Sequence, residues 1–471
     1  MEQYVSRNES KVPRRVLGAL LASVSAGVVP RTGAPYIAIG RTEEITAIAS
    51  DLARVADGEG AMRFIVGRYG SGKSFLMQLV RGYAAENGFV TADADLSPER
   101  RLTGSGGVGV ATYRELMRNL STKSAPDGGA LPSIIARWFT SLSESLVAEG
   151  FSPASPAFDE AFEKRIYASL RSLETFVGGF DFAAVLGAYY RAYRAGDDDR
   201  MSACLRWLRG EWNTRTEARE AIGIRSLGIV TDDTWYDTLK LLAAFVRMVG
   251  YAGLCVFVDE GVNLYKITNR VSREANYEKI LAMFNDTLQG HAEGLFIAFG
   301  GTPQFLEDQR RGLFSYEALR SRLSDGRFAA AGQFKSLMGP VIRLRRLSDG
   351  ELYALLLRLR RLHGDYHGTE PRITDAEIGD FLTASLARAG ADEMMTPREI
   401  IRDFVTLLDL LLQNPDADFA SLVGVLRPEP KATEKPGTQG APTVGTGSAS
   451  ATGTGSTPAT GAGKPIPTIE L

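Results

Sequence analysis

Short runs of apolar residues alternate with longer amphipathic segments along most of the chain. The runs Phe64–Val66, Leu254–Val258, Leu295–Phe299 and Val341–Leu344 have the apolar, β-rich character of buried strands. Uninterrupted apolar runs of this kind are typical of parallel strands covered on both faces, and the segments between them show the helical spacing of apolar positions. The pattern therefore predicts an α/β fold, a parallel sheet flanked by helices.

The pattern also divides the chain into four parts. Residues 1–60 hold a helix-like run, Arg14–Ser25, an extended stretch, Tyr36–Arg41, and a helix whose cap we place at Thr42. Residues 61–345 contain the predicted strands and a large helical insert at about 130–250. The insert is far longer than the connection that a parallel sheet needs.

The last two parts are a helical bundle and a tail. Residues 346–426 show three amphipathic segments, and capping boxes are predicted at Ser348 with Glu351 and at Thr374 with Glu377. Residues 427–471 are rich in Gly, Thr, Pro and Ala and contain no aromatic residue. Such a composition buries too little apolar surface to offset chain entropy, so we expect this tail to be disordered.

Composition narrows the setting. The net charge of −2 gives no global argument for nucleic-acid binding, although a local basic patch stays possible. Two cysteines, Cys204 and Cys255, lie in apolar runs and favour a reducing cytoplasm over a disulfide framework. Three histidines without a CxxC pair argue against a zinc site. The N-terminal apolar run is short and broken, and no run approaches the roughly 18 apolar residues of a membrane span.

The first chemical motif is a phosphate-binding loop, GRYGSGKS, at 67–74. It follows the apolar run Phe64–Val66 and opens an amphipathic helix, which is the strand–loop–helix context that a P-loop requires. Backbone N–H groups of the loop and the helix N-terminus would surround the phosphates of ATP. Lys73 would reach the β- and γ-phosphates, and the Ser74 hydroxyl would bind Mg²⁺. The residues predicted to contact the nucleotide here are Gly67, Gly70, Ser71, Gly72, Lys73, Ser74 and Phe75.

An acidic pair, Asp259-Glu260, follows the run Leu254–Val258. A P-loop needs a carboxylate from a second strand to hold the metal ion, and Asp259 suits this role. Glu260 would orient and deprotonate the attacking water, a function that a switch without hydrolysis would not need. The next strand, Leu295–Phe299, should place a polar group beside the γ-phosphate, and Thr302 is the candidate. The other interpretation of Thr302 is a bystander in a glycine-rich turn.

The order of these motifs and of two later arginines resembles that of AAA+ ATPases. The resemblance implies that Arg398, in TPREII, reaches the γ-phosphate from a helical lid. It also implies that Arg322, or else Arg320, acts on a neighbouring subunit's phosphate as an arginine finger, and that Ile39, Gly40 and Arg41 contact adenine. Arginines on solvated helix faces are common, so a purely surface role stays open for Arg322 and Arg398. The finger role requires a homo-oligomer with nucleotide at the subunit interfaces.

A narrower resemblance rests on longer stretches. VGRYGSGKSF, VDEGVNLYKI, FGGTPQFLEDQRRGLFSYEALRSRL and MTPREIIRDF are similar to the BREX-type, BrxD-like ATP-binding proteins of bacterial anti-phage islands. The similarity spans nearly all of 13–405 and leaves out the tail. It implies an AAA+ ATPase related to origin-recognition and helicase-loader proteins, which uses ATP and Mg²⁺ and works with a helicase or another defence protein on DNA.

The insert offers a separate candidate for nucleic-acid contact. Aromatic and basic residues alternate in it: Tyr189, Tyr190, Arg191, Tyr193 and Arg194, then Arg206, Arg209, Arg215, Arg219 and Arg225. Such residues can stack on bases and hold phosphates. The simpler interpretation is a helical subdomain whose aromatics form a core and whose arginines pair with nearby glutamates. Asp93 and Asp95, in TADADLSPERR, would either contact nucleotide or a partner at the catalytic edge of the sheet, or lie in a solvated loop.

Two functions follow. The first is an ATPase whose cycle drives assembly or remodelling of a partner on DNA. The second is a nucleotide-gated scaffold or signalling switch in which hydrolysis is slow or incidental.

Overall fold

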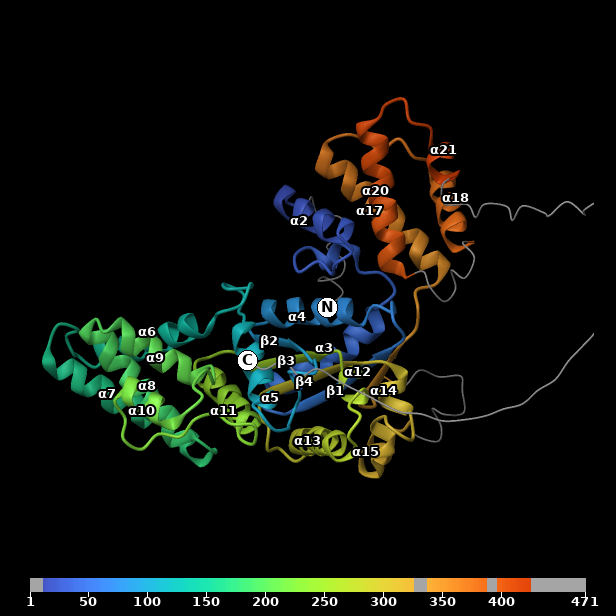
Figure 1. Cartoon of the computed structure of the whole chain (residues 1–471). Helices are drawn as coiled ribbons and strands as arrows, with labels where there is room; N and C mark the ends of the chain where they lie inside the picture. Colours follow the sequence, from blue (N-terminus) through green and yellow to red (C-terminus); the bar gives the residue numbers. More distant parts are fainter. Residues whose placement is uncertain (1–11, 326–336, 388–395, 425–471) are drawn as a thin grey trace, which may run out of the picture. The chain divides into compact units, whose positions relative to one another are not determined.

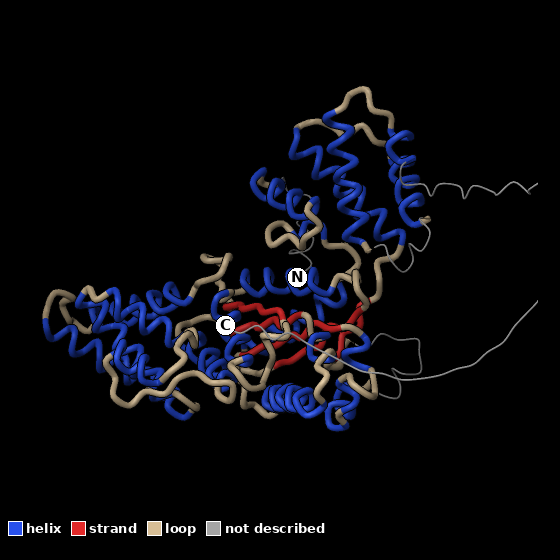
Figure 2. The backbone as a smooth tube through the Cα atoms, in the orientation of Figure 1, coloured by secondary structure: helices blue, strands red, loops and turns tan. Residues whose placement is uncertain are grey.

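The computed structural model describes residues 12–325, 337–387 and 396–424 (Figures 1 and 2). All of them belong to one unit of the chain, Met1–Pro428. The predicted disordered tail, 427–471, lies outside the described residues.

A five-stranded sheet lies at the centre of this unit, with the strand order β2-β3-β4-β1-β5. All neighbouring strands pair in parallel, as the apolar runs predicted. The strands are β1 (Ala61–Gly67), β2 (Val90–Asp95), β3 (Leu254–Asp259), β4 (Leu295–Gly301) and β5 (Val341–Leu344). Gly300 and Gly301 are part of β4, not of a turn beyond it.

The alternation of side chains along the strands fills two separate cores. Ala61 and Ile65 of β1 pack on one face with helices α3 (Thr42–Ala56) and α4 (Lys73–Glu86). Met62, Phe64 and Val66 pack on the other face. The helices that cover this second face are α5 (Val108–Arg118), α11 (Trp235–Met248) and α13 (Arg270–Leu288) (Figure 1). Because both faces are covered, the strands read as continuous apolar runs.

Short elements follow the strands on the way to β5. They are α12 (Val262–Tyr265), α14 (Pro303–Glu307), η4 (Leu313–Ser315) and α15 (Glu317–Leu323). Since parallel strands end at the same edge of a sheet, the residues after β1, β3 and β4 meet at that edge.

The N-terminal segment differs in detail from the sequence prediction. Helix α2 (Arg14–Ser25) forms as predicted, but the stretch predicted to be extended begins with a 3₁₀ turn, η2 (Ala34–Ile37). Pro35 and the left-handed Gly33, with φ 84°, set up this turn. Thr42 is the first residue of α3 and not its cap. Arg41 takes the N-cap position, because its carbonyl accepts the first helical hydrogen bond, from the Ile45 N–H at 3.0 Å.

The insert is helical. Its elements before α11 are α6 (Leu131–Ala148), α7 (Pro156–Leu170), η3 (Arg171–Thr175), α8 (Gly179–Ala195), α9 (Asp198–Leu208) and α10 (Arg215–Ile222). Aromatic rings hold α6, α7 and α8 together: Phe162 stacks on Tyr190 with centroids 4.2 Å apart, and Phe139 meets Tyr190 edge-on. Its apolar residues continue the core on the α11 side of the sheet.

The C-terminal bundle contains α17 (Asp349–His367), α18 (Asp375–Leu386), α20 (Pro397–Gln413) and α21 (Phe419–Gly424). The predicted capping boxes at Ser348 and Thr374 are confirmed. A third one, which the sequence analysis missed, begins α20 at Thr396, with Glu399 as the partner. Leu17 and Leu20 of α2 pack into the same core as these helices.

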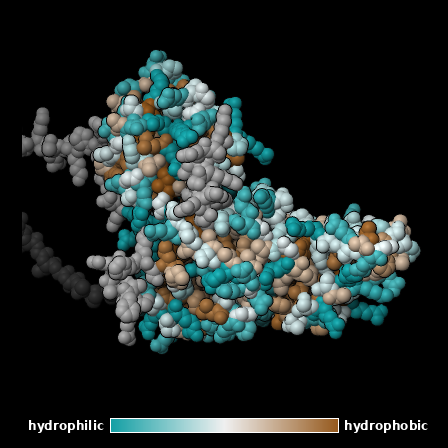
Figure 3. All heavy atoms as spheres, turned by 180° about the vertical axis from the view of Figure 1, so that it is seen from behind, coloured by the Kyte–Doolittle hydropathy of each residue, from teal (hydrophilic) through white to brown (hydrophobic). Residues whose placement is uncertain are grey.

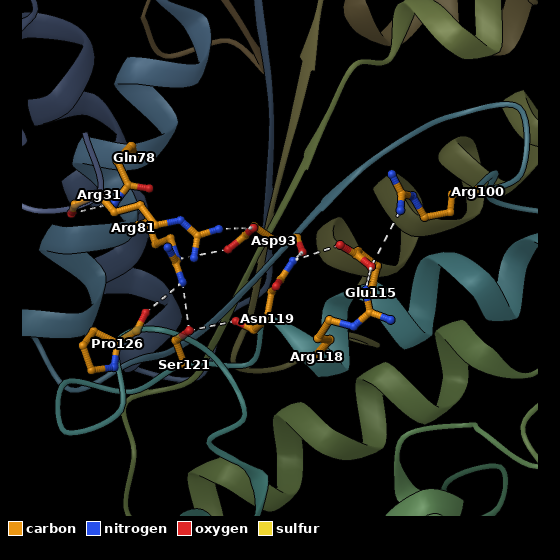
Figure 4. A network of polar contacts seen from close by, with 10 residues as sticks. All are labelled: Arg31, Gln78, Arg81, Asp93, Arg100, Glu115, Arg118, Asn119, Ser121 and Pro126. Carbon is orange, nitrogen blue, oxygen red and sulfur yellow. Dashed lines mark hydrogen bonds and ion pairs between the residues drawn. The ribbon is translucent and has the colours of Figure 1, made fainter. Parts of the chain in front are cut away.

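A polar network fixes the β2 edge of the sheet (Figure 4). The Arg81 guanidinium of α4 lies 3.2 Å from the Asp93 carboxylate and donates to the Ser121 hydroxyl at 2.8 Å. Asn119 donates to the Asp93 carbonyl at 2.9 Å. Burial lowers the pKa of Arg81, and the neighbouring Asp93 opposes this effect. Asp93 therefore anchors a buried arginine.

Hydrophilic side chains lie among scattered hydrophobic ones on the face that Figure 3 shows. None of the helices in the described parts of the chain combines the length and apolar character needed to cross a bilayer.

Candidate functional site

The loop between β1 and α4 forms a tight cradle of glycines. Gly70 and Gly72 take left-handed conformations, with φ 77° and 87°, which favour glycine. A Cβ at Gly67 would lie 2.2 Å from the Ser71 hydroxyl oxygen, and one at Gly70 would lie 2.8 Å from the Thr396 methyl carbon. The buried Ser71 hydroxyl has no hydrogen-bond partner among the described residues. A crowded glycine loop with an unsatisfied polar atom suits a phosphate ligand.

The first residues of α4 meet the end of β3. The Ser74 hydroxyl donates to Asp259 Oδ2 at 2.6 Å, although the two residues are 185 positions apart in the sequence. The other oxygen of Asp259 accepts from the Glu260 N–H at 2.8 Å. A hydroxyl and a carboxylate in contact are hard oxygen ligands, so this pair suits Mg²⁺.

Glu260 has an unusual backbone. Its φ of 57° is the only positive value among the described non-glycine residues. The neighbouring backbone holds it there: the Gly261 N–H donates to the Gly300 carbonyl, and the Asn263 N–H donates to the Glu260 carbonyl, both at 2.9 Å. A residue in this conformation costs roughly 1–3 kcal/mol, and such residues cluster at functional sites.

A third carboxylate, that of Asp95, lies near Asp259 and Glu260. Asp95 ends β2 and is in register with Asp259 of β3. Burial raises the pKa of Asp95, and the charges of Asp259 and Glu260 raise it further. The sequence suggested that Asp93 and Asp95 could lie at the catalytic edge of the sheet. Asp95 lies there, in register with Asp259, whereas Asp93 pairs with Arg81.

A cavity of about 240 Å³ opens beside the P-loop. One wall is polar and contains Tyr69–Phe75 together with Glu260. Much of the remaining lining is apolar and consists of Val24, Val28, Val29, Pro30, Ile37, Ile39, Leu347, Leu355 and Ile401. A cavity with one phosphate-binding end and one apolar end suits a nucleotide.

The structure brings most of the predicted nucleotide residues to this cavity. Its lining includes Ile39, Arg41, Gly70, Ser71, Gly72, Lys73, Ser74, Phe75, Glu260 and Arg398. Gly40 and Gly67 are not in the lining; a Cβ at Gly40 would lie 2.3 Å from Glu351 Oε1. The apolar part of the lining was not predicted from the sequence; it includes Val24, Val28, Val29, Pro30, Leu355 and Ile401. The signal available was the apolar run VVP, separated by two residues from the end of the helix Arg14–Ser25.

The buried side chain of Arg41 bridges two backbone segments, one of which is the P-loop. Its Nη2 donates to the Ser71 and Arg345 carbonyls, each at 2.7 Å, and its Nη1 lies 3.7 Å from Glu44. Burial lowers the pKa of Arg41, and Glu44 opposes this effect. The side chain thus connects the P-loop to the segment that leads from β5 into α17.

Thr302, Arg320 and Arg322 lie outside this cavity. The Thr302 hydroxyl caps α14 and accepts from the Phe305 N–H at 3.3 Å; Thr302 lines an adjoining hollow that also includes Tyr69 and Thr396. Arg322 is exposed and donates to Asn285 at 3.1 Å, while Arg320 lies 3.5 Å from Glu317. Within this chain, Thr302 therefore shares a hollow with the P-loop residue Tyr69, whereas the contacts of Arg320 and Arg322 are with residues outside the P-loop.

The aromatic and basic cluster of the insert is largely used in packing. Tyr189 and Tyr190 are buried, and Arg194 pairs with Asp159 at 2.7 Å. Arg191 pairs with Glu163. Farther along, Arg206 stacks on Trp212 and Arg209 pairs with Glu211. Tyr193, by contrast, is 59% exposed. These contacts favour the interpretation of a helical subdomain with paired arginines over that of a stacking surface.

The comparisons with known proteins agree with a nucleotide site. The search of curated proteins found no match. The family model described as BREX system ATP-binding protein BrxC/D matches residues 12–426, which include the P-loop, the acidic pair and Arg398. Because the match covers most of the sequence, the chain belongs to the BrxC/D family of BREX system ATP-binding proteins.

Proposed function

We propose that this BREX ATP-binding protein is an AAA+ ATPase that hydrolyses ATP. The observation that carries the proposal is the position of Glu260. It lines the same cavity as the P-loop, directly follows the Asp259–Ser74 pair, and is held in a conformation that costs energy. Binding alone would require the cradle and the metal ligands but not a strained carboxylate beside them.

Each residue then has a task. The loop N–H groups and Lys73 bind the phosphates, and Arg398 reaches the γ-phosphate from α20. The apolar wall around Ile39 and Leu355 takes the adenine. Glu260 accepts a proton from the attacking water and orients it. Mg²⁺, held by Ser74 and Asp259, would neutralise charge on the β- and γ-phosphates.

The site is completed by a second subunit in this proposal. Arg322 and Arg320 are exposed on α15, so a neighbouring chain of the same kind could receive either one as an arginine finger. The resulting homo-oligomer would assemble or remodel a helicase or another defence protein on DNA in the cytoplasm. Membership in a BREX system family supports the defence setting.

A second function has an observation in its favour. Thr302 is engaged as a helix cap, and Arg322 lies away from the cavity. Two of the groups expected for fast hydrolysis therefore lie outside the nucleotide cavity of this chain. A nucleotide-gated scaffold, in which ATP binding controls assembly and turnover is incidental, fits that arrangement.

The test of hydrolysis is Glu260→Gln. We expect ATP affinity to stay within about twofold and turnover to fall by about 10²–10³-fold, since general base catalysis typically contributes this much. Glu293→Gln is the matched control, because Glu293 is exposed and outside the site. Equal turnover in Glu260→Gln and the wild type would refute the assignment of the base.

Size-exclusion chromatography separates the two functions. The samples are the wild type with ATP, with ADP and without nucleotide, with turnover measured on each and again after addition of DNA and the partner helicase. Assembly with ATP and negligible turnover in every sample would support the scaffold. Turnover that rises with assembly would support the ATPase.

A further inference from the structure

Two of the three histidines meet an aspartate in the C-terminal bundle. His363 and His367 are four residues apart on α17, and Asp409 lies on α20, which packs against α17. One ligand atom of each residue lies within 4.8 Å of the other two. The chain has no CxxC pair, but the HGDYH spacing puts both imidazoles on one helix face, as in zinc sites built on a helix.

The distances are close to those of a metal site. His363 Nε2 lies 2.9 Å from Asp409 Oδ1, and the rings of His363 and His367 have centroids 4.4 Å apart. Zinc bonds of about 2.0–2.2 Å place tetrahedral ligand atoms roughly 3.4 Å apart. His363 and Asp409 lie near that range, and the ligand atom of the exposed His367 lies within 4.8 Å of both.

Burial and charge also suit a cation. His363 is 2% exposed, Asp409 is half-buried, and His367 faces solvent. The carboxylate of Asp409 brings a negative charge to the cluster. This charge offsets that of the nearby cation Arg14, whose guanidinium lies over the Tyr366 ring.

We propose that His363, His367 and Asp409 form a site for a divalent transition-metal ion of the Zn²⁺ type, which links α17 to α20. Two imidazoles and one carboxylate are common zinc ligands, and the solvent-facing side leaves the fourth position to water. The proposal is independent of the nucleotide cavity, because none of the three residues lines it.

The experiment uses the full, untagged chain without nucleotide. The protein is stripped with EDTA, equilibrated with ZnSO₄, freed of unbound ion and assayed for metal content and melting temperature. His367→Ala removes an exposed ligand, so it should fold, and Asp409→Asn removes the carboxylate while keeping the side-chain size. His291→Ala is the matched control, since His291 is the remaining histidine and is also exposed.

We expect one Zn²⁺ per chain in the wild type and in His291→Ala, and a higher melting temperature when zinc is bound. His367→Ala and Asp409→Asn should each weaken binding by at least about 100-fold and lose the thermal shift. Wild-type protein that retains no zinc, or equal retention in His367→Ala and His291→Ala, would overturn the proposal. If the wild type retains no zinc, His363 is only a buried histidine that pairs with Asp409. If both variants retain zinc equally, zinc binds at the carboxylates of the nucleotide site.

Discussion

Glu260 combines a proposed catalytic role with a backbone conformation that costs stability. Its left-handed backbone costs energy that a glycine would not incur, and the contacts around Gly261 and Asn263 hold it in place. The side chain nevertheless lies in the P-loop cavity. Selection for stability alone would favour glycine here.

This conformation yields a prediction on stability. Glu260→Gly should be more stable than Glu260→Ala, with a free energy of unfolding higher by at most about 1 kcal/mol, because relief of strain exceeds the extra chain entropy of glycine only modestly. Thermal unfolding of both variants measures the difference. If the alanine variant is the more stable one, the backbone strain is not real.

Single residues of the site differ in how far the sequence specifies them. Lys73, Ser74 and Asp259 could be predicted, because motif spacing and strand ends determine where they lie. The backbone of Glu260 could not, since no local pattern encodes a positive φ at a glutamate. The hydrogen bond from Arg41 to the Arg345 carbonyl joins residues 304 positions apart in the sequence, so only the tertiary structure shows this contact.

Among the elements, α17 has an N-terminus with unusual electrostatics. Glu351 closes the capping box with Ser348 and also receives two hydrogen bonds of 2.6 Å from Arg345. Hydrogen bonding from Arg345, and then from Ser348, lowers the pKa of Glu351 to about 2. The ordinary value is 4.5, so the ionised carboxylate is favoured in the folded state.

The sign of this shift determines a pH dependence. A lowered folded-state pKa adds stability above the unfolded value, so the contribution is complete above about pH 4.5 and is lost as the pH falls to about 2. Glu351→Gln should cost about 1 kcal/mol at pH 7, as for a lost helix cap, and progressively less below pH 4.5. Thermal unfolding from pH 7 to pH 3 measures it.

Glu377→Gln is the control for that series. Glu377 closes the capping box of α18, but no arginine in the described residues contacts it. Its loss should therefore be smaller than that of Glu351→Gln at pH 7. A pH-independent difference between Glu351→Gln and the wild type would contradict the role of the carboxylate charge.

The insert helices provide a second test at this scale. Tyr190 is 4% exposed and stacks on Phe162, whereas Tyr193, one turn away, is exposed. Tyr190→Ala should lower the free energy of unfolding by about 3–5 kcal/mol, as for other large aromatic-to-alanine changes in cores, and Tyr193→Ala by less than about 0.5 kcal/mol. Denaturant unfolding compares them. Equal losses would show that the aromatic core is not organised around Tyr190.

Element types were easier to predict than element partners. The strands follow from apolar runs and two of the capping boxes from their spacing, because both signals are local. Which aromatic residues of the insert are buried could not be predicted, since aromatic and basic residues alternate in the same way on a stacking surface and on a packed helix. The packing of α2 with α17 and α20 joins segments more than 300 residues apart.

For the whole molecule, we expect nucleotide binding to stabilise the fold. The cavity is lined by residues from α2, the P-loop and α20, so bound ATP contacts all three. At 100 times the dissociation constant, ATP with Mg²⁺ should add about 2.7 kcal/mol. Lys73→Ala should abolish the shift in melting temperature, and an equal shift in that variant would place the nucleotide elsewhere.

The proposed oligomer can be tested by mixing inactive chains. If Arg322 acts on a neighbour, Arg322→Ala and Lys73→Ala should each be inactive alone. In a mixed oligomer, some sites would combine Lys73 of the first variant with Arg322 of the second, and these sites would be complete. Turnover in the mixture should then exceed that of either variant by at least about tenfold. Arg310→Ala is the control, because Arg310 is also an exposed arginine and lies outside α15. No recovery on mixing would indicate that Arg322 does not act between subunits.

The contact between Gly70 and Thr396 bears on how fast a nucleotide is released rather than on how tightly it binds. The P-loop lies so close to the first turn of α20 that even one methyl group would not fit between them. If the cavity holds nucleotide as proposed, we expect release of ADP to require that this turn move away from the loop. The lifetime of bound ADP would then depend on the separation of the P-loop from α20 as well as on the chemical step.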